Sequence, residues 1–149
     1  MRAVIQRVSE AYVTVEGQET GRIGKGFCAL IGVEAGDTEK DAVYLAGKIV
    51  KLRIFEDENG KMNRSVREVQ GGILCVSQFT LLGDARGQNR PGFTMAEAPE
   101  RADELYRLVC LKMREMDVPV ETGVFRTDMQ IEMCNDGPVT ILLDSEKIF

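Results

Sequence analysis

Four consecutive residues that can present hydrogen-bonding groups or an aromatic ring, Ser77, Gln78, Phe79 and Thr80, follow directly after the apolar run 73–76. A short apolar run predicts a buried strand, and a strand end that opens into a loop is where a rigid scaffold can hold polar groups against a ligand. The alternative is that Ser77 and Thr80 only satisfy backbone groups at the end of the strand, as such residues commonly do.

The absence of histidine restricts the chemistry of this chain more than any other feature of its composition. It excludes a Ser-His-Asp or Cys-His nucleophilic site and histidine-ligated zinc, and leaves acid–base work to carboxylates, Lys, Tyr, water or the substrate. The four cysteines, Cys28, Cys75, Cys110 and Cys134, stand singly among apolar neighbours without C-x-x-C spacing, which favours reduced core residues. We therefore expect no metal and no cofactor.

A second polar stretch, Asn135, Asp136, Gly137 and Pro138, has the composition of a turn. The simplest interpretation is a hairpin turn that joins two strands at 129–134 and 139–143. A Gly-Pro pair also leaves two carbonyl oxygens unobstructed by a glycine side chain, and a cis bond could point both the same way. Because only ~5% of X-Pro bonds in folded proteins are cis, the local sequence does not decide the isomer.

The length of 149 residues predicts one domain over 1–149, long enough to bury roughly two-thirds of the surface of its unfolded chain. No run of 18 apolar residues occurs and the first seven residues are too polar for a signal peptide, so we expect a cytoplasmic protein. The net charge of −5 differs from the positive charge that is typical of proteins that bind the phosphates of nucleic acid.

The pattern of strands and helices predicts an α/β domain. Two amphipathic helices are expected, one beginning near Thr38 and one at Pro99. The continuous apolar run 27–33 is the best candidate for a central strand, and residues 62–72 and 83–94 have no clear period. Further strands are expected at 1–8, 11–15, 21–23, 52–55, 73–76, 118–125, 129–134 and 139–143. We expect mixed, mostly antiparallel sheets with both helices on one side.

The order and spacing of these motifs resemble those of D-aminoacyl-tRNA deacylases over almost the whole chain. The resemblance is carried by residues 76–81, 89–93, 122–129 and 135–140, with support from 1–8 and 52–57. Two positions depart from the family pattern. Residues 87–89 replace a basic residue and glycine before Arg90, and Gly92 stands where the family has serine. Arg86 lies in the same loop, so the positive charge of that basic residue is displaced along the loop.

The resemblance implies a homodimeric hydrolase that cleaves the ester between a D-amino acid and the terminal adenosine of tRNA. It implies a three-layer α/β/β fold, active sites at the subunit interface and no cofactor. In the family a cis Gly-Pro pair, here Gly137 and Pro138, reaches from one subunit into the active site of the other. The segment from Ser77 to Thr80 forms the other wall of that site.

Three further residues receive roles from the resemblance. Arg7 is assigned to steadying the Gly-Pro loop, and Phe125 and Met129 to the pocket that holds the terminal adenosine. Because the net charge is acidic, tRNA binding requires a local basic rim. We expect that rim at Arg86 and Arg90, together with Lys48, Lys51, Arg53 and Arg64.

A physical mechanism fits this family assignment. Main-chain oxygens close to the substrate α-carbon would collide with an L side chain, whereas a D side chain of any size, or glycine, would be accepted. Backbone N–H groups at Phe79 and Thr80 can stabilise the charge that develops on the ester oxygen. The 2′-hydroxyl beside the ester can orient the attacking water, which makes histidine unnecessary. Thr80 as a nucleophile is the alternative.

Two other functions remain open on the sequence alone. The first is an ester or amide hydrolase that acts on D-amino acid derivatives without tRNA. The second is a non-catalytic dimeric binding module, in which residues 135–138 form only an interface turn.

Overall fold

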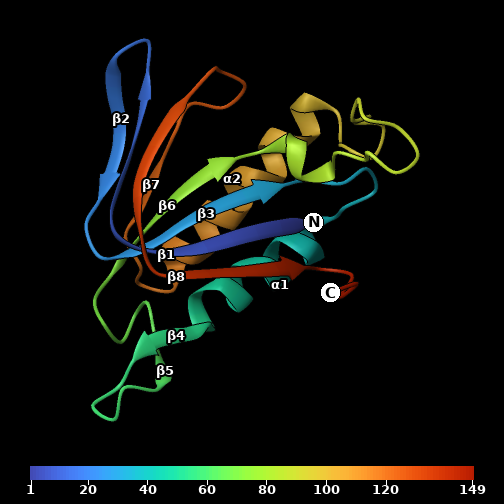
Figure 1. Ribbon diagram of the computed structural model, residues 1–149. Helices are drawn as coiled ribbons and strands as arrows, with labels where there is room; N and C mark the ends of the chain where they lie inside the picture. The colour runs from blue at the N-terminus through green and yellow to red at the C-terminus, as the bar shows by residue number, and fades with distance from the viewer.

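The computed structural model describes residues 1–149 and shows a strongly curled six-stranded sheet with two helices on one side (Figure 1). The strands run in the order β2-β1-β3-β6-β7, and β8 pairs with the free side of β1. The β3–β6 and β6–β7 pairs are parallel and the others antiparallel, which confirms the predicted mixed α/β class. The strands are β1 (Arg2–Val15), β2 (Gln18–Ile23), β3 (Gly26–Gly32), β6 (Gly72–Ser77), β7 (Val120–Thr122) and β8 (Gln130–Asp144).

The two main helices begin where their capping signals predict. The helix α1 (Glu39–Lys51) follows Thr38, whose backbone N–H donates to the Asp41 carboxylate at 2.8 Å. The helix α2 (Pro99–Glu115) begins with proline, which lacks the N–H that a helix start leaves unpaired anyway. Both helices bury their apolar stripes in one core with β1, β3 and β6.

A second, smaller core lies on the other face of the sheet, inside its curl. It joins Val13 of β1, Cys28 of β3, and Leu74 and Val76 of β6. The strand β6 is therefore covered on both faces, and this explains why its sequence is a continuous apolar run and not an alternating one. Such a strand is a rigid support for the residues that follow it.

Two segments differ in extent from their predicted form. Residues 62–72 were expected to be an irregular or weakly paired connection, and their first part, β5 (Met62–Ser65), pairs with β4 (Arg53–Glu56) in a separate two-stranded sheet. The strand expected at 118–125 is limited to β7, and the chain after Thr122 leaves the sheet. At Gly123 an added Cβ would lie 2.5 Å from the Met129 sulfur, so the absence of a side chain lets this loop fold back on itself.

The predicted hairpin turn at residues 135–138 was wrong. The whole segment from Gln130 to Asp144 is one strand that pairs with β1 on both sides of an excursion. Thr140 lies opposite Gln6, and Asn135 lies opposite Val8. Residues 136–139 of β8 therefore face the single residue Arg7 of β1, and they form a bulge. The turn-forming residues therefore produce a protrusion in the middle of a strand.

Three of the four cysteines are buried, as predicted, but Cys134 is exposed and is not a core residue. All four are free thiols, and burial raises the pKa of Cys28 to about 12. No helix of the structure combines the length and the apolar character needed to cross a membrane.

Candidate functional site

The polar segment 77–80 begins at the last residue of the strand β6, at the edge of the sheet. Ser77 is its last residue and pairs in register with Ile31 of β3. The next residue, Gln78, donates its backbone N–H to the Ile31 carbonyl at 2.8 Å, which holds the end of β6 in place. At Gly32 an added Cβ would lie 2.6 Å from Leu82, so glycine there allows the following turn to pack closely against β3.

The polar segment is a turn of 3-10 helix, η1 (Phe79–Leu82), and not an open loop. Its first hydrogen bond runs from the Leu81 N–H to the Gln78 carbonyl at 3.3 Å. The N–H groups of Phe79 and Thr80 precede that bond and have no intrahelical acceptor, as at any helix start. The Gln78 side chain donates to the Thr80 hydroxyl, and the Phe79 ring is 57% exposed.

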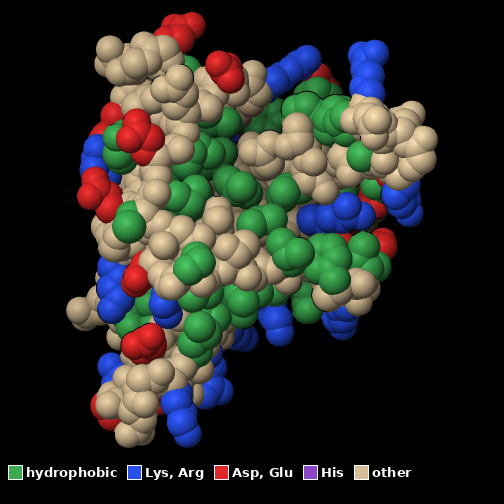
Figure 2. Space-filling model, in the orientation of Figure 1, with side chains coloured by type: hydrophobic (Ala, Val, Ile, Leu, Met, Phe, Trp, Pro, Cys, Tyr) green, Lys and Arg blue, Asp and Glu red, His purple; other side chains and the backbone are tan.

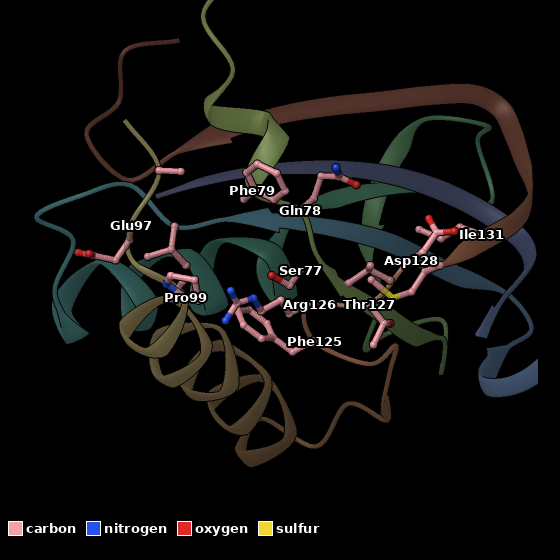
Figure 3. Close-up of a pocket in the computed structure, with 15 residues that line it drawn as sticks. Ser77, Gln78, Phe79, Glu97, Pro99, Phe125, Arg126, Thr127, Asp128 and Ile131 are labelled. Carbon is pink, nitrogen blue, oxygen red and sulfur yellow. The ribbon is translucent and has the colours of Figure 1, made fainter. Parts of the chain in front are cut away.

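A cavity of about 500 Å³ lies beside this turn, between the end of β6, the start of α2 and the loop that leads into β8 (Figure 3). It brings together five of the residues predicted for the site: Ser77, Gln78, Phe79, Phe125 and Met129. Thr80 does not line it. The remaining lining residues were not recognisable as one site from the sequence: Val33, Val76, Ala96, Glu97, Pro99, Ala102, Arg126, Thr127, Asp128 and Ile131.

The back of the cavity is apolar and firmly supported. The Phe125 ring lies 6.2 Å from the Tyr106 ring, and the Tyr106 hydroxyl donates to the Cys75 carbonyl in β6 at 2.7 Å. This hydrogen bond ties α2 to the strand that carries Ser77. At the mouth of the cavity Phe79 packs edge-on against Phe93, with 5.1 Å between the ring centroids. A flat aromatic ligand suits these surfaces.

Gly137 and Pro138 do not line this cavity. They lie on the β8 excursion, both are exposed, and the peptide bond between them is cis, the isomer that the resemblance implies. Within one chain, therefore, the two groups of predicted site residues occupy separate places.

Arg7 connects the excursion to the body of the protein by two hydrogen bonds. Its side chain is buried, and it donates to the Asp136 carbonyl at 3.0 Å and to the Ile54 carbonyl at 2.7 Å. The Asp136 carboxylate adds a longer ionic contact of 3.9 Å. Because a guanidinium carries several N–H donors that point in different directions, Arg7 can donate to the Asp136 and Ile54 carbonyls at the same time.

Replacing Arg7 by methionine is expected to lower the free energy of unfolding by about 2–4 kcal/mol. The buried Ile54 carbonyl and the partly buried Asp136 carbonyl would lose their donor, and an unsatisfied buried group costs about 1–3 kcal/mol. Urea titration measures this change. Arg7→Lys should lose less, because one ammonium group can replace only part of the fork. Equal stability of all three proteins would show that the two hydrogen bonds contribute nothing.

The expected basic rim was wrong in its placement. Arg86 lies in the 83–94 loop but is paired with Asp84, and this hydrogen-bonded guanidinium holds the pKa of the Asp84 carboxyl well below its usual range. Lys51 and Arg53 line a different hollow. None of the six predicted cations lines the cavity, whereas Arg126, which no sequence pattern marked, does. No group of three or more His, Cys, Asp or Glu side chains is arranged to hold a metal ion.

Comparison with known proteins gives consistent results. The family model described as D-Tyr-tRNA(Tyr) deacylase matches residues 4–144. The D-aminoacyl-tRNA deacylase of Anaeromyxobacter dehalogenans is 60% identical over 100% of both chains. That of Symbiobacterium thermophilum is 56% identical over 100% of this chain and 99% of its own.

Two solved structures resemble this fold. The first, described as c-Myc DNA Unwinding Element Binding Protein, has a TM-score of 0.90 and 42% identity over 97% of this chain and 98% of its own. The second, described as a probable eukaryotic D-amino acid tRNA deacylase, has a TM-score of 0.79 over 95% of this chain and 97% of its own. At 20% identity, the second likeness supports the fold alone.

Proposed function

This chain belongs to the D-Tyr-tRNA(Tyr) deacylase family, and from that premise we propose that it hydrolyses the ester between a D-amino acid and the terminal adenosine of tRNA. Both products, the free D-amino acid and the tRNA, are released. The observation that supports the proposal is the cavity, which is lined by Ser77, Gln78 and Phe79 together with the side chains of Phe125 and Met129. Because aminoacyl-tRNA is used in the cytoplasm, the enzyme acts there.

The reaction is assigned to the η1 turn and the substrate together. Water attacks the ester carbonyl, and the N–H groups of Phe79 and Thr80 stabilise the negative charge that develops on its oxygen. No histidine is present to take the proton from this water. The 2′-hydroxyl of the terminal ribose, adjacent to the ester, orients the water in its place. Terminal adenosine packs against Phe125 and Met129, which fixes the position of the ester.

Selection of D over L substrates is assigned to Gly137 and Pro138 of a second subunit. In one chain these two residues are exposed and lie outside the cavity, so they are free to enter the cavity of a partner. Their carbonyl oxygens then face the substrate α-carbon and exclude an L side chain, whereas a D side chain points away. Glycine, which has no side chain, is not excluded.

A row of apolar side chains on the sheet supports the homodimer. Leu30, Val4 and Leu142 are direct neighbours across β3, β1 and β8, on the face that the helices do not cover. Leu142 is 54% exposed, and Figure 2 shows hydrophobic side chains gathered in the middle of this face. Burying such a row against a second copy removes apolar surface from water.

A deacylation assay on matched substrates tests the proposal. D-tyrosyl-tRNA is expected to be hydrolysed about 100-fold or more faster than L-tyrosyl-tRNA, because steric exclusion acts on the L enantiomer alone. Glycyl-tRNA should be hydrolysed as well. If a free D-tyrosine ester were hydrolysed as fast as D-tyrosyl-tRNA, the result would favour a hydrolase that does not require tRNA. Intact dimers without any deacylation at high protein concentration would favour a binding module.

A further inference from the structure

Arg126 is the only lysine or arginine that lines the cavity. Its side chain is exposed, and it forms neither a salt bridge nor a hydrogen bond with any group of the chain. In Figure 3 its guanidinium extends across the cavity, between the labelled residues Ser77 and Pro99. Most other arginines in this acidic protein have a carboxylate or carbonyl partner, so this guanidinium is available to a ligand.

The backbone of Arg126 adopts a conformation that favours glycine. Its φ is +62°, within a turn that the Thr127 hydroxyl closes by donating to the Val124 carbonyl at 2.9 Å. A side chain in this left-handed region costs free energy, and such residues concentrate at functional sites. The turn presents the long side chain of Arg126 to the cavity in spite of that cost.

Two carboxylates, Glu97 and Asp128, also line the cavity. Glu97 is engaged by backbone donors, since it accepts from the Ala98 N–H at 2.7 Å and the Gly36 N–H at 3.3 Å. These acids repel an anion elsewhere in the cavity. Arg126 therefore carries the only positively charged side chain on the cavity lining that can stabilise an anionic group of a ligand.

We propose that Arg126 binds the phosphate on the 5′ side of the terminal adenosine, and is a positioning residue for the reaction. The inference rests on the proposed function, which places the adenosine against Phe125 and Met129, on either side of Arg126 in the same loop. A guanidinium matches the oxygen geometry of a phosphate and stays charged. Holding that phosphate fixes the end of the tRNA, so that the ester meets the N–H groups of Phe79 and Thr80.

Binding of adenosine and of adenosine 5′-monophosphate, measured by calorimetry at low salt, tests this assignment. The wild-type protein is expected to bind the monophosphate about two- to fivefold more tightly, the effect of one exposed charged contact. In Arg126→Gly and Arg126→Gln the two ligands should bind equally. Arg126→Gly also keeps the fold, because glycine adopts a φ of +62° freely. High salt should reduce the wild-type preference.

The control is Arg107→Gln, which removes an exposed arginine that does not line the cavity. It should keep the wild-type preference, because it changes net charge without changing the site. Equal binding of both ligands by the wild-type protein would overturn the proposal, and so would an unchanged preference in Arg126→Gln. If neither ligand binds although D-aminoacyl-tRNA is hydrolysed, the phosphate assignment fails and the deacylase stands. A phosphate preference without deacylation would support the phosphate site and count against the deacylase.

Kinetics with D-aminoacyl-tRNA separate positioning from a general structural effect. Arg126→Gln should raise KM about two- to fivefold and leave kcat nearly unchanged, because the phosphate is held equally in the ground state and in the transition state. The dependence of kcat/KM on salt should also become shallower, by about one phosphate contact. Arg126→Lys should recover part of the loss. A fall in kcat at unchanged KM would contradict a phosphate contact that is equally strong in the ground state and in the transition state.

Discussion

A D-aminoacyl-tRNA whose terminal adenosine lacks the 2′-hydroxyl is expected to be deacylated about 100- to 10,000-fold more slowly than the normal substrate, the range typical of a lost acid–base group. The cavity contains no histidine and no lysine that could activate water. The Ser77 hydroxyl has no basic partner, and Thr80 lies outside the cavity lining. The comparison requires an aminoacyl group attached to the 3′ position in both substrates, with the rate measured at saturating enzyme.

Two variants act as controls for this result. Thr80→Val removes the hydroxyl that could act as a nucleophile, and Asp128→Asn removes a carboxylate of the cavity that could act as a base. Both are expected to retain activity within about fivefold, the loss from a minor polar contact. A near-normal rate with the deoxy substrate, or a loss of about 100-fold in either variant, would place the acid–base group on the protein.

Replacing Gly137 by alanine is expected to lower D-aminoacyl-tRNA hydrolysis by about 100-fold and to reduce the preference for D over L. The φ of Gly137 is +134°, which alanine rarely adopts. The added Cβ would lie 2.7 Å from the Val139 side chain and 3.2 Å from the Arg7 guanidinium, so the excursion must shift. A displacement of about 1 Å in a substrate-positioning group is enough for a loss of this size.

Gly47→Ala is the matched control for this substitution. Gly47 lies within α1, and an added Cβ there would have no neighbour within 4 Å. It should leave activity unchanged and raise the stability by up to about 1 kcal/mol, because alanine favours a helix over glycine. If Gly137→Ala hydrolysed D-aminoacyl-tRNA at the wild-type rate and kept the wild-type preference for D over L substrates, the excursion would take no part in selecting the enantiomer.

Much of the fold is predictable because its strongest signals are local. The apolar run that forms β3 and the proline that begins α2 each lie within their own element. The end of β6 could also be identified, since polar side chains follow an apolar run there. By contrast, the continuity of β8 through residues 135–138 depends on Arg7, which is remote in sequence and binds the Asp136 carbonyl. Composition alone therefore indicated a turn.

The cavity residues that the sequence did not predict also depend on contacts between segments that are distant in the chain. Arg126 occupies a backbone conformation that usually signals glycine, so nothing in the neighbouring sequence marks it as a cavity residue. Glu97 and Pro99 reach the cavity only because α2 packs beside β6. The basic rim was misplaced because charge in a sequence does not show pairing, as Arg86 and Asp84 illustrate.

The cavity wall at Ile131 and the protrusion at Gly137 belong to one strand, and pairing with β1 sets the position of both. A gain or loss of one residue between them would turn every side chain of the shifted part to the opposite face of the sheet. Descendants of this chain should therefore vary in length at the exposed 83–94 segment, while the stretch from 131 to 137 accepts exchanges of residue type but keeps its spacing. The cavity wall at Ile131 and the excursion therefore keep a fixed position relative to each other.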